Sequence, residues 1–552
     1  MLFSRKGAGE WMSKGFALTE RGQHADALKC YDRALGLEPD SAEAWCGRGE
    51  VLRRLERCDD AGVCFDRALE INPDLAEAWR NKGQILYHRK QYAEAVFCSE
   101  QVIRQNPDDA AAWYAKGKAL NRLKRYENAL ECFDCVIGIR PDFAGAWFEK
   151  GSALILVKEF DKATICLDAV TTIEPDHAEA WLLKGKLHLM LHQNETAIRC
   201  FDQVVRILPD HPGAWYSRGI AAERLQHSDV AIKCLERTLA INPGDVDALY
   251  HKGLVLHHLG RDEEAIACFD QILQINGKDA ATWFHRGICF YSLQRYNGAI
   301  GCYDHALQID QANPEIWHHK SLALLRLNRY EEARACCDHA LKLKPGHAGL
   351  LLAMAESLFL LGRYEEAATW YEQGCARNPG DIAAWKNRGG VLSRLGQYDA
   401  ALACYEQASE MDPDLPGIWK EKADLLSIMG RYTEASACYD TELARNPKHT
   451  DAWYRKGLIM HALERYDKAL LYFDRALALD PGLINAIAAK GDAFRALRQY
   501  KRAVDCYTQC LAANPENTRF LGAMGEALTE LGRIGEAKRC FDRIESLSGK
   551  HC

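Results

Sequence analysis

A single 34-residue pattern repeats sixteen times along the chain, and this periodicity constrains the fold more than any other feature. A tryptophan recurs at one position of the pattern: Trp11, Trp45, Trp79, Trp113, Trp147, Trp181, Trp215, Trp283, Trp317, Trp385, Trp419 and Trp453. Leu249, Leu351, Ile487 and Leu521 fill the same position in the other four repeats. Only residues 1–7 and Cys552 lie outside the repeats, so we expect a repeat array with no separate catalytic domain.

We number the repeats one to sixteen and read them as one continuous domain. They span residues 8–41, 42–75, 76–109, 110–143, 144–177, 178–211, 212–245, 246–279, 280–313, 314–347, 348–381, 382–415, 416–449, 450–483, 484–517 and 518–551.

Each repeat has the pattern of two helices. In repeat four, Asp109 supplies capping chemistry for a helix that starts near Ala110, and apolar residues then recur at three- and four-residue steps. A polar break at 124–127 precedes a second apolar run, and Pro141 ends it because proline disfavours helix in the residue before it. The sequence therefore predicts a helical hairpin.

Small residues mark where the two helices approach each other. The position of Ala129 is alanine in all sixteen repeats, and the position of Gly117 is glycine in thirteen. A leucine in the alanine position is expected to overpack the pair, at a cost of about 1–3 kcal/mol.

Trp, Gly, Ala, Phe or Tyr, and Pro at these offsets resemble the tetratricopeptide repeat over almost the whole chain. The resemblance implies an all-α solenoid, a right-handed superhelix of antiparallel helix pairs whose first helices line a concave groove. In this family the groove usually receives an extended peptide or a helix from a partner protein.

Composition narrows the class of protein. Apolar residues make up 48% of the chain and charged residues 27%, and the net charge is only −7. We find no basic stripe with interleaved aromatics, which argues against a nucleic-acid partner. No secretory signal and no apolar run of about 20 residues is present, so we expect a soluble, cytoplasmic protein without membrane insertion.

Fourteen of the 22 cysteines occupy one position of the repeat: Cys30, Cys64, Cys98, Cys132, Cys166, Cys200, Cys234, Cys268, Cys302, Cys336, Cys404, Cys438, Cys506 and Cys540. Trp370 and Tyr472 fill the same position elsewhere, so it is apolar packing space. Neighbouring helices lie about 8–10 Å apart, too far for disulfides. The pattern predicts packing in a reducing compartment, with redox or metal chemistry as the alternative.

Two charged positions face each other in the pattern. Lys or Arg follows the aromatic by three residues in fourteen repeats, as at Lys116, and an acidic residue such as Asp32 follows the cysteine position by two in fifteen. We expect these ladders to pair along the surface, with roughly 0–1 kcal/mol from each pair.

The groove positions of the family lie one and five residues after the aromatic. In repeats four to ten these positions carry an apolar run that begins at Tyr114, and histidines lie beside it. The candidate partner-binding residues are Phe148, Leu182, Tyr216, Ile220, Tyr250, His251, Leu254, Phe284, His285, Ile288, His319 and Leu322. Such a stripe fits a partner with an apolar segment. The alternative is that these side chains pack between neighbouring first helices.

The histidines step by a whole repeat, about 10 Å, which is too far to share one metal ion. The sequence contains no catalytic constellation, so we predict no enzyme activity, no metal and no cofactor. A two-carboxylate clamp for the tails of Hsp70 and Hsp90 needs an asparagine four residues after a groove lysine. Gly390 follows Lys386 and Asp424 follows Lys420, so these chaperone tails are not expected partners.

Two irregularities remain in the pattern. Gly277 and Gln311 replace the proline that ends the second helix, which predicts altered junctions at 276–279 and 310–314. Gly549 replaces it in the last repeat, where Phe541 and Ile544 are expected to stay partly exposed. The main hypothesis is therefore an interaction scaffold, and the alternative is a homo-oligomer that associates through its terminal repeats.

Overall fold

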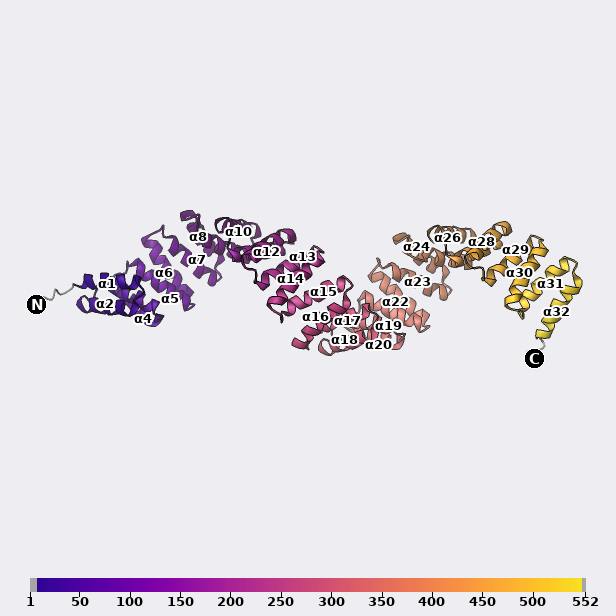
Figure 1. The fold of residues 1–552 in the computed structure, drawn as a ribbon, viewed down its shortest axis with the longest axis horizontal. Helices are drawn as coiled ribbons and strands as arrows, with labels where there is room; N and C mark the ends of the chain where they lie inside the picture. Colours follow the sequence, from indigo (N-terminus) through magenta and orange to yellow (C-terminus); the bar gives the residue numbers. More distant parts are fainter. Residues whose placement is uncertain (1–6, 549–552) are drawn as a thin grey trace. The chain divides into compact units, whose positions relative to one another are not determined.

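The computed structural model describes residues 7–548, and these form helices joined by short loops (Figure 1). Residues 1–6 and 549–552, with the predicted N-terminal lead up to residue 6, Gly549 and Cys552, lie outside the described residues. First helices have 13 residues, except for α25 with 11, and second helices have 14, except for α32 with 15. The all-α solenoid that the periodicity predicted is confirmed.

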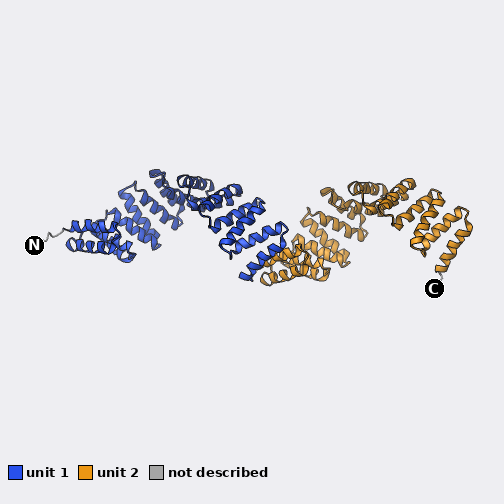
Figure 2. Ribbon diagram, viewed as in Figure 1, with its two compact units in different colours: residues 1–277 blue, residues 278–552 orange. Residues whose placement is uncertain are grey.

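The helices belong to two compact units, residues 1–277 and 278–552 (Figure 2). The boundary falls at Gly277, where the helix-ending proline is missing. Each unit stacks hairpin after hairpin in chain order, so we describe each by itself.

The first unit contains sixteen helices within its described residues. They are α1 (Ala8–Glu20), α2 (His24–Leu37), α3 (Ala42–Arg54), α4 (Cys58–Ile71), α5 (Ala76–His88), α6 (Tyr92–Gln105), α7 (Ala110–Arg122), α8 (Tyr126–Ile139), α9 (Ala144–Leu156), α10 (Phe160–Ile173), α11 (Ala178–Met190), α12 (Asn194–Ile207), α13 (Pro212–Arg224), α14 (Ser228–Ile241), α15 (Val246–His258) and α16 (Asp262–Ile275).

The second unit also contains sixteen helices in the part that the structure describes. They are α17 (Ala280–Ser292), α18 (Tyr296–Ile309), α19 (Pro314–Arg326), α20 (Tyr330–Leu343), α21 (Ala348–Leu360), α22 (Tyr364–Arg377), α23 (Ile382–Arg394), α24 (Tyr398–Met411), α25 (Ile418–Ile428), α26 (Tyr432–Arg445), α27 (Thr450–Ala462), α28 (Tyr466–Leu479), α29 (Ile484–Ala496), α30 (Tyr500–Ala513), α31 (Thr518–Glu530) and α32 (Ile534–Ser548).

In most repeats the glycine makes room for a ring on the second helix. A Cβ at Gly117 would lie 2.7 Å from the ring of Phe133, sixteen residues later, which is closer than real side chains approach. The same close contact joins Gly287 to Tyr303 and Gly457 to Phe473. This glycine is therefore needed for a ring-on-backbone contact that fills the hairpin, a role that the sequence pattern did not reveal. The nearby alanine position, as at Ala129, is buried in every repeat.

The recurring tryptophan ties its repeat to the preceding turn. In repeat six, Nε1 of Trp181 donates to the carbonyl oxygen of Pro175 at 2.8 Å. The equivalent bond is present for ten tryptophans, from Trp45 to Trp453. Trp317 makes it to the carbonyl of Gln311 at 3.0 Å, so the missing proline does not change this contact. The junction at 310–314 does differ at its cap, as predicted: the side chain of Asn313 accepts from the backbone N–H of Glu315, two residues later, whereas Asp109 accepts from Ala112, three residues later. The indole bond and the helix lengths are unchanged.

A second irregular junction lies at the start of repeat thirteen. Repeats seven and thirteen both begin with Pro-Gly, yet α13 starts at its proline and α25 starts two residues later, after Gly417 with φ of 75°. In repeat seven the side chain of His211 accepts a hydrogen bond from the backbone N–H of Ala214 at 3.0 Å. Leu415 stands in the equivalent place, and its side chain has no hydrogen-bond acceptor. The first turn of α25 therefore has no side-chain cap.

The charged ladders pair as predicted. Lys184 contacts Asp168 of the preceding repeat at 2.6 Å and lies 4.8 Å from the centre of the Trp181 ring. In the second unit Lys320 and Asp304 repeat the arrangement at 2.6 Å. Where both residues are present, the ladder therefore links a repeat to its neighbour through a cation that also covers the tryptophan.

A candidate partner-binding face

The first helices of neighbouring repeats contact one another within each unit, as α3 does with α1 and α5. Among the described residues, pairs of second helices do not approach as closely. The stack is therefore tighter on the side of the first helices, which we call the inner face. The residues one and five places after the aromatic position lie on these helices.

In the first unit the predicted stripe is mostly half-buried. Phe148, Leu182, Tyr216, Tyr250, His251 and Leu254 each keep part of their surface exposed, whereas Ile220 is 9% exposed and belongs to the core. His251 is held in place, because its Nδ1 lies 3.0 Å from a carboxylate oxygen of Glu223 and its ring stands edge-on to Tyr216. The structure thus brings the stripe to one face but makes Ile220 a packing residue.

The second unit carries the rest of the stripe. Phe284, His285, Ile288, His319 and Leu322 are all half-buried. The rings of Phe284 and His319 meet edge-on with centres 5.1 Å apart, and burial lowers the pKa of His319. Phe284 of α17 thus packs on His319 of α19, and all five side chains still present surface. Both interpretations of the sequence, packing and partner binding, therefore remain compatible with these positions.

A cavity of about 390 Å³ opens on the inner face of the first unit, at repeats three and four. Its lining includes buried Ser99 and Val102 of α6 and exposed Arg80 and Gln84 of α5, so it connects the core with solvent. Sequence reasoning missed it. The available signal was Ser99, which stands where most second helices carry a ring.

The inner face of repeat thirteen, in the second unit, is closed by its own side chains. The hydroxyl of Tyr439 donates a hydrogen bond to Asp424. The same carboxylate lies 2.9 Å from Nζ of Lys420 and 3.3 Å from the guanidinium of Arg455. Charged groups there satisfy one another, which leaves little unpaired polarity for a partner.

The cysteines of the repeat position are core residues. All fourteen are buried, and no described cysteine forms a disulfide. Burial raises the pKa of Cys98, Cys132 and Cys166 to about 11, so these thiols stay protonated at neutral pH. Arg48 donates to the sulfur of Cys64 at 2.9 Å, a further packing contact. These observations support the packing interpretation.

Comparison with known families assigns the repeat. Models described as tetratricopeptide repeat or TPR repeat match residues 15–56, 56–119, 110–143, 185–249, 320–382, 382–415, 420–484 and 494–547. The chain belongs to the tetratricopeptide repeat family. A model described as anaphase-promoting complex, cyclosome, subunit 3 matches residues 224–306. No curated protein matches the sequence.

Solved tetratricopeptide repeat structures are similar only in part. The structure of YrrB, titled a TPR protein with an unusual peptide-binding site, is 23% identical, covers 34% of this chain and 97% of its own, and has a TM-score of 0.32. The Cut9–Hcn1 hetero-tetramer of the APC/C is 16% identical and covers 90% of this chain and 98% of that one, with a TM-score of 0.34. Naa15/Naa10 bound to HypK-THB is 16% identical over 98% of this chain and 94% of that one, with a TM-score of 0.34. These scores are too low to support inference from any one of them.

No helix in residues 7–548 combines the length and apolar character needed to cross a membrane.

Proposed function

We propose that this protein is a non-catalytic interaction scaffold that binds a segment of a partner protein, a peptide or a helix, on its inner face. Membership of the tetratricopeptide repeat family supports a protein partner, and arrays of this family are typically non-catalytic. The observation that carries the proposal is the run of half-buried apolar side chains on the first helices of the first unit, from Phe148 to Leu254. The free, buried thiols support a reducing compartment such as the cytoplasm.

The energetics of such a face are sufficient for moderate affinity. A fully buried apolar side chain contributes about 1.5–3 kcal/mol, and each of these side chains already buries part of its surface. Three or four anchors, reduced by this prior burial and by the cost of ordering the partner, correspond to micromolar rather than nanomolar binding. The face is therefore suited to a reversible partner.

Site-specific crosslinking tests the proposal. A photo-crosslinking amino acid at Leu182 or Leu254 on the inner face should capture a partner from a cell lysate. The same amino acid at Ile165, which is 64% exposed on the second helix α10, should capture little and is the matched control. Equal capture from all three positions, or capture from Ile165 alone, would move the binding site to the outer face.

The second candidate, association between copies through the terminal repeats, is favoured by two side chains of α32. Ile534 is 61% exposed and Phe541 is 40% exposed. Sedimentation velocity over a range of concentrations, with Ile534→Lys/Phe541→Ser as the variant, decides this candidate. A monomer at all concentrations rules it out.

A further inference from the structure

Repeat three lacks the ring that fills most of the other hairpins. Ser99 occupies its position, and the facing residue is still Gly83. A Cβ at Gly83 would meet only Cβ of Cys98 at 3.1 Å and the carbonyl oxygen of Ala95 at 3.8 Å, whereas at Gly117 it would meet a ring at 2.7 Å. The space that the ring occupies in repeat four is therefore empty in repeat three.

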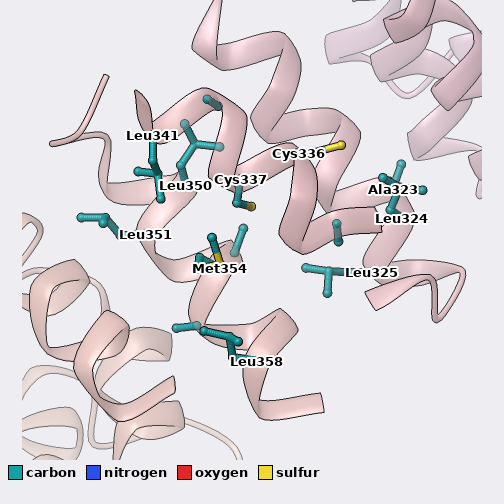
Figure 3. Packing of buried hydrophobic residues seen from close by; sticks show 14 of the residues in the cluster. Ala323, Leu324, Leu325, Cys336, Cys337, Leu341, Leu350, Leu351, Met354 and Leu358 are labelled. Atoms are coloured by element: carbon teal, nitrogen blue, oxygen red, sulfur yellow. The ribbon is translucent and has the colours of Figure 1, made fainter. Parts of the chain in front are cut away.

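Repeat ten shows how the array closes such a space when it is not needed. Its ring is also missing, because Cys337 holds the position, but Ser321 replaces the facing glycine. Both residues are fully buried, and Cys337 lies beside Leu350 and Met354 in a packed cluster (Figure 3). Repeat three has also lost the ring, but it keeps the facing glycine, so no larger side chain fills the space. The result is the cavity of about 390 Å³, a volume in the range of ligand pockets.

The walls of the cavity are aromatic. Tyr87 of α5, Tyr114 of α7 and Phe143 line it, with the rings of Tyr114 and Phe143 edge-on at 4.9 Å. Its floor contains Gly83 and Val102. A flat apolar group entering the cavity would rest on Gly83 and meet ring edges, the arrangement that aromatic pairs prefer.

The rim of the cavity is basic. Arg80, His88, Lys118 and Arg140 line it. Arg80 is paired with Asp109 at 2.7 Å and Arg140 lies 4.0 Å from Asp142, so the charge of Lys118 is the least compensated. Nζ of Lys118 lies 5.4 Å from the ring centre of Tyr87 and 5.1 Å from that of Tyr114, and none of the carboxylates in residues 7–548 forms an ion pair with it. Lys118 thus offers a positive charge above an apolar hole, which is complementary to a carboxylate beside an apolar anchor.

We propose that this cavity is an anchor pocket for a partner segment that carries an aromatic side chain next to an acidic residue. The aromatic ring takes the place on Gly83 that Phe133 takes on Gly117, and the carboxylate binds Lys118. The pocket rests on the proposed function, because it lies on the same inner face, and it adds the chemistry of the segment. It lies in repeats three and four, before the apolar stripe.

The test uses the full chain and short synthetic peptides with a fluorescent label. One peptide has a central phenylalanine flanked by aspartates, a second has alanine in its place, and a third has asparagines in place of the aspartates. We expect the first to bind at least tenfold more tightly than the other two in fluorescence anisotropy. Lys118→Gln should remove the preference for aspartate over asparagine and keep the preference for phenylalanine over alanine.

Filling the cavity supplies the decisive variant. Ser99→Phe should weaken the first peptide at least tenfold, and Leu167→Phe, which changes the same position in repeat five, should leave its affinity unchanged. Circular dichroism checks folding, and Ser99→Leu, with the residue found at this position in repeats five and seven, replaces Ser99→Phe if that variant does not fold.

The proposal is overturned if the Ser99 variants bind the first peptide like the original chain, or if none of the peptides binds in preference to the others. Dimerisation that is lost in Ser99→Phe would identify a second copy as the occupant and would also overturn it. If a partner still crosslinks to Leu182 or Leu254 in either case, the inner-face scaffold stands and only the pocket fails.

Discussion

Repeats three and thirteen use the same positions on the same hairpin to opposite effect. In repeat three the ring position holds Ser99 and the inner face opens into a cavity with an unpaired lysine at its rim. In repeat thirteen Tyr439 fills the hairpin and its hydroxyl binds Asp424 on the inner face, where two basic side chains complete the network. Both hairpins have a second helix of 14 residues, although α25 of repeat thirteen is two residues shorter than α5 of repeat three. The side chain at the ring position of the second helix is therefore one of the differences that accompany an open or a closed inner face.

The largest expected effect comes from removing the ring of repeat thirteen. Tyr439→Ser should lower the local free energy of unfolding by about 3–5 kcal/mol, because it leaves a cavity and deprives Asp424 of its hydroxyl donor. Hydrogen exchange of α25 and α26 measures the change. Tyr439→Phe is the control and should cost only about 1 kcal/mol, since the ring remains. If Tyr439→Ser costs less than its control, the ring does not distinguish the two repeats.

Repeat ten is also closed at its ring position, and its stability is expected to depend on pH. Burial, with the nearby His319 and His347, lowers the pKa of His318 to about 4, although Glu315 opposes the shift. The unfolded chain binds the proton near pH 6.5, so the stabilisation is complete above that pH and is lost as the pH falls from 6.5 towards 4. The loss is about 3 kcal/mol. Glu315 itself pairs with His347 at 2.7 Å.

Hydrogen exchange of α19–α21 between pH 7 and 4.5, corrected for intrinsic rates, checks this expectation. His318→Phe places an aromatic residue where Phe148 and Phe284 stand in other repeats and should flatten the pH dependence. Helices α27–α29 provide the internal reference. An unchanged pH dependence in the variant would assign it to other groups.

Filling the cavity of repeat three should stabilise the chain. Ser99→Phe is expected to raise the local stability by about 1.5–3 kcal/mol, because the new ring is buried on Gly83. Cys337→Phe in repeat ten is the contrasting variant. It should cost about 1–3 kcal/mol, since Ser321 already occupies the space. Thermal unfolding and hydrogen exchange of the two variants should move in opposite directions, and a shift of equal sign would remove the distinction.

The charged ladder should show the smallest effect and no difference between the two regions. Lys184→Gln in the first unit and Lys422→Gln in the second each remove one inter-repeat pair, of 2.6 Å and 3.3 Å. Each should cost below about 1 kcal/mol, and less at high salt. Thermal melts at low and high salt measure both. A cost several times larger in one unit would show that the ladder, too, separates the regions.

Most of the fold could be predicted because similar residue types recur at the same positions of the repeats. The helix start at Ala110, the buried cysteines and the paired charges all followed from periodicity, whereas α8 begins at Tyr126, inside the predicted polar break at 124–127. The hydrogen bond of Trp181 was not predicted, since periodicity shows that a side chain recurs and not which atom it binds. The glycine–ring contact was missed for the same reason.

The candidate site was harder to predict because its features are exceptions to the pattern. The cavity depends on one departure, Ser99, and on the absence of a matching change at Gly83. Ile220 looked like a groove anchor in sequence, yet it is only 9% exposed because the neighbouring first helices cover it. The residue types at each repeat position reveal the shared pattern. Whether a given side chain is buried or exposed depends on the distances between helices.

The cysteines at the shared repeat position can report local opening of the array. Fourteen repeats carry one buried thiol at the same place, and burial keeps these sulfurs out of reach of alkylating reagents. A reagent such as iodoacetamide can therefore label the buried thiol of a given repeat only while that repeat is open, whereas the half-buried Cys58 and Cys135 are accessible without opening. Peptide mass spectrometry after timed labelling would read the opening frequency of each hairpin separately, without introducing a probe. The native cysteines can therefore report the local stability of each hairpin along the chain.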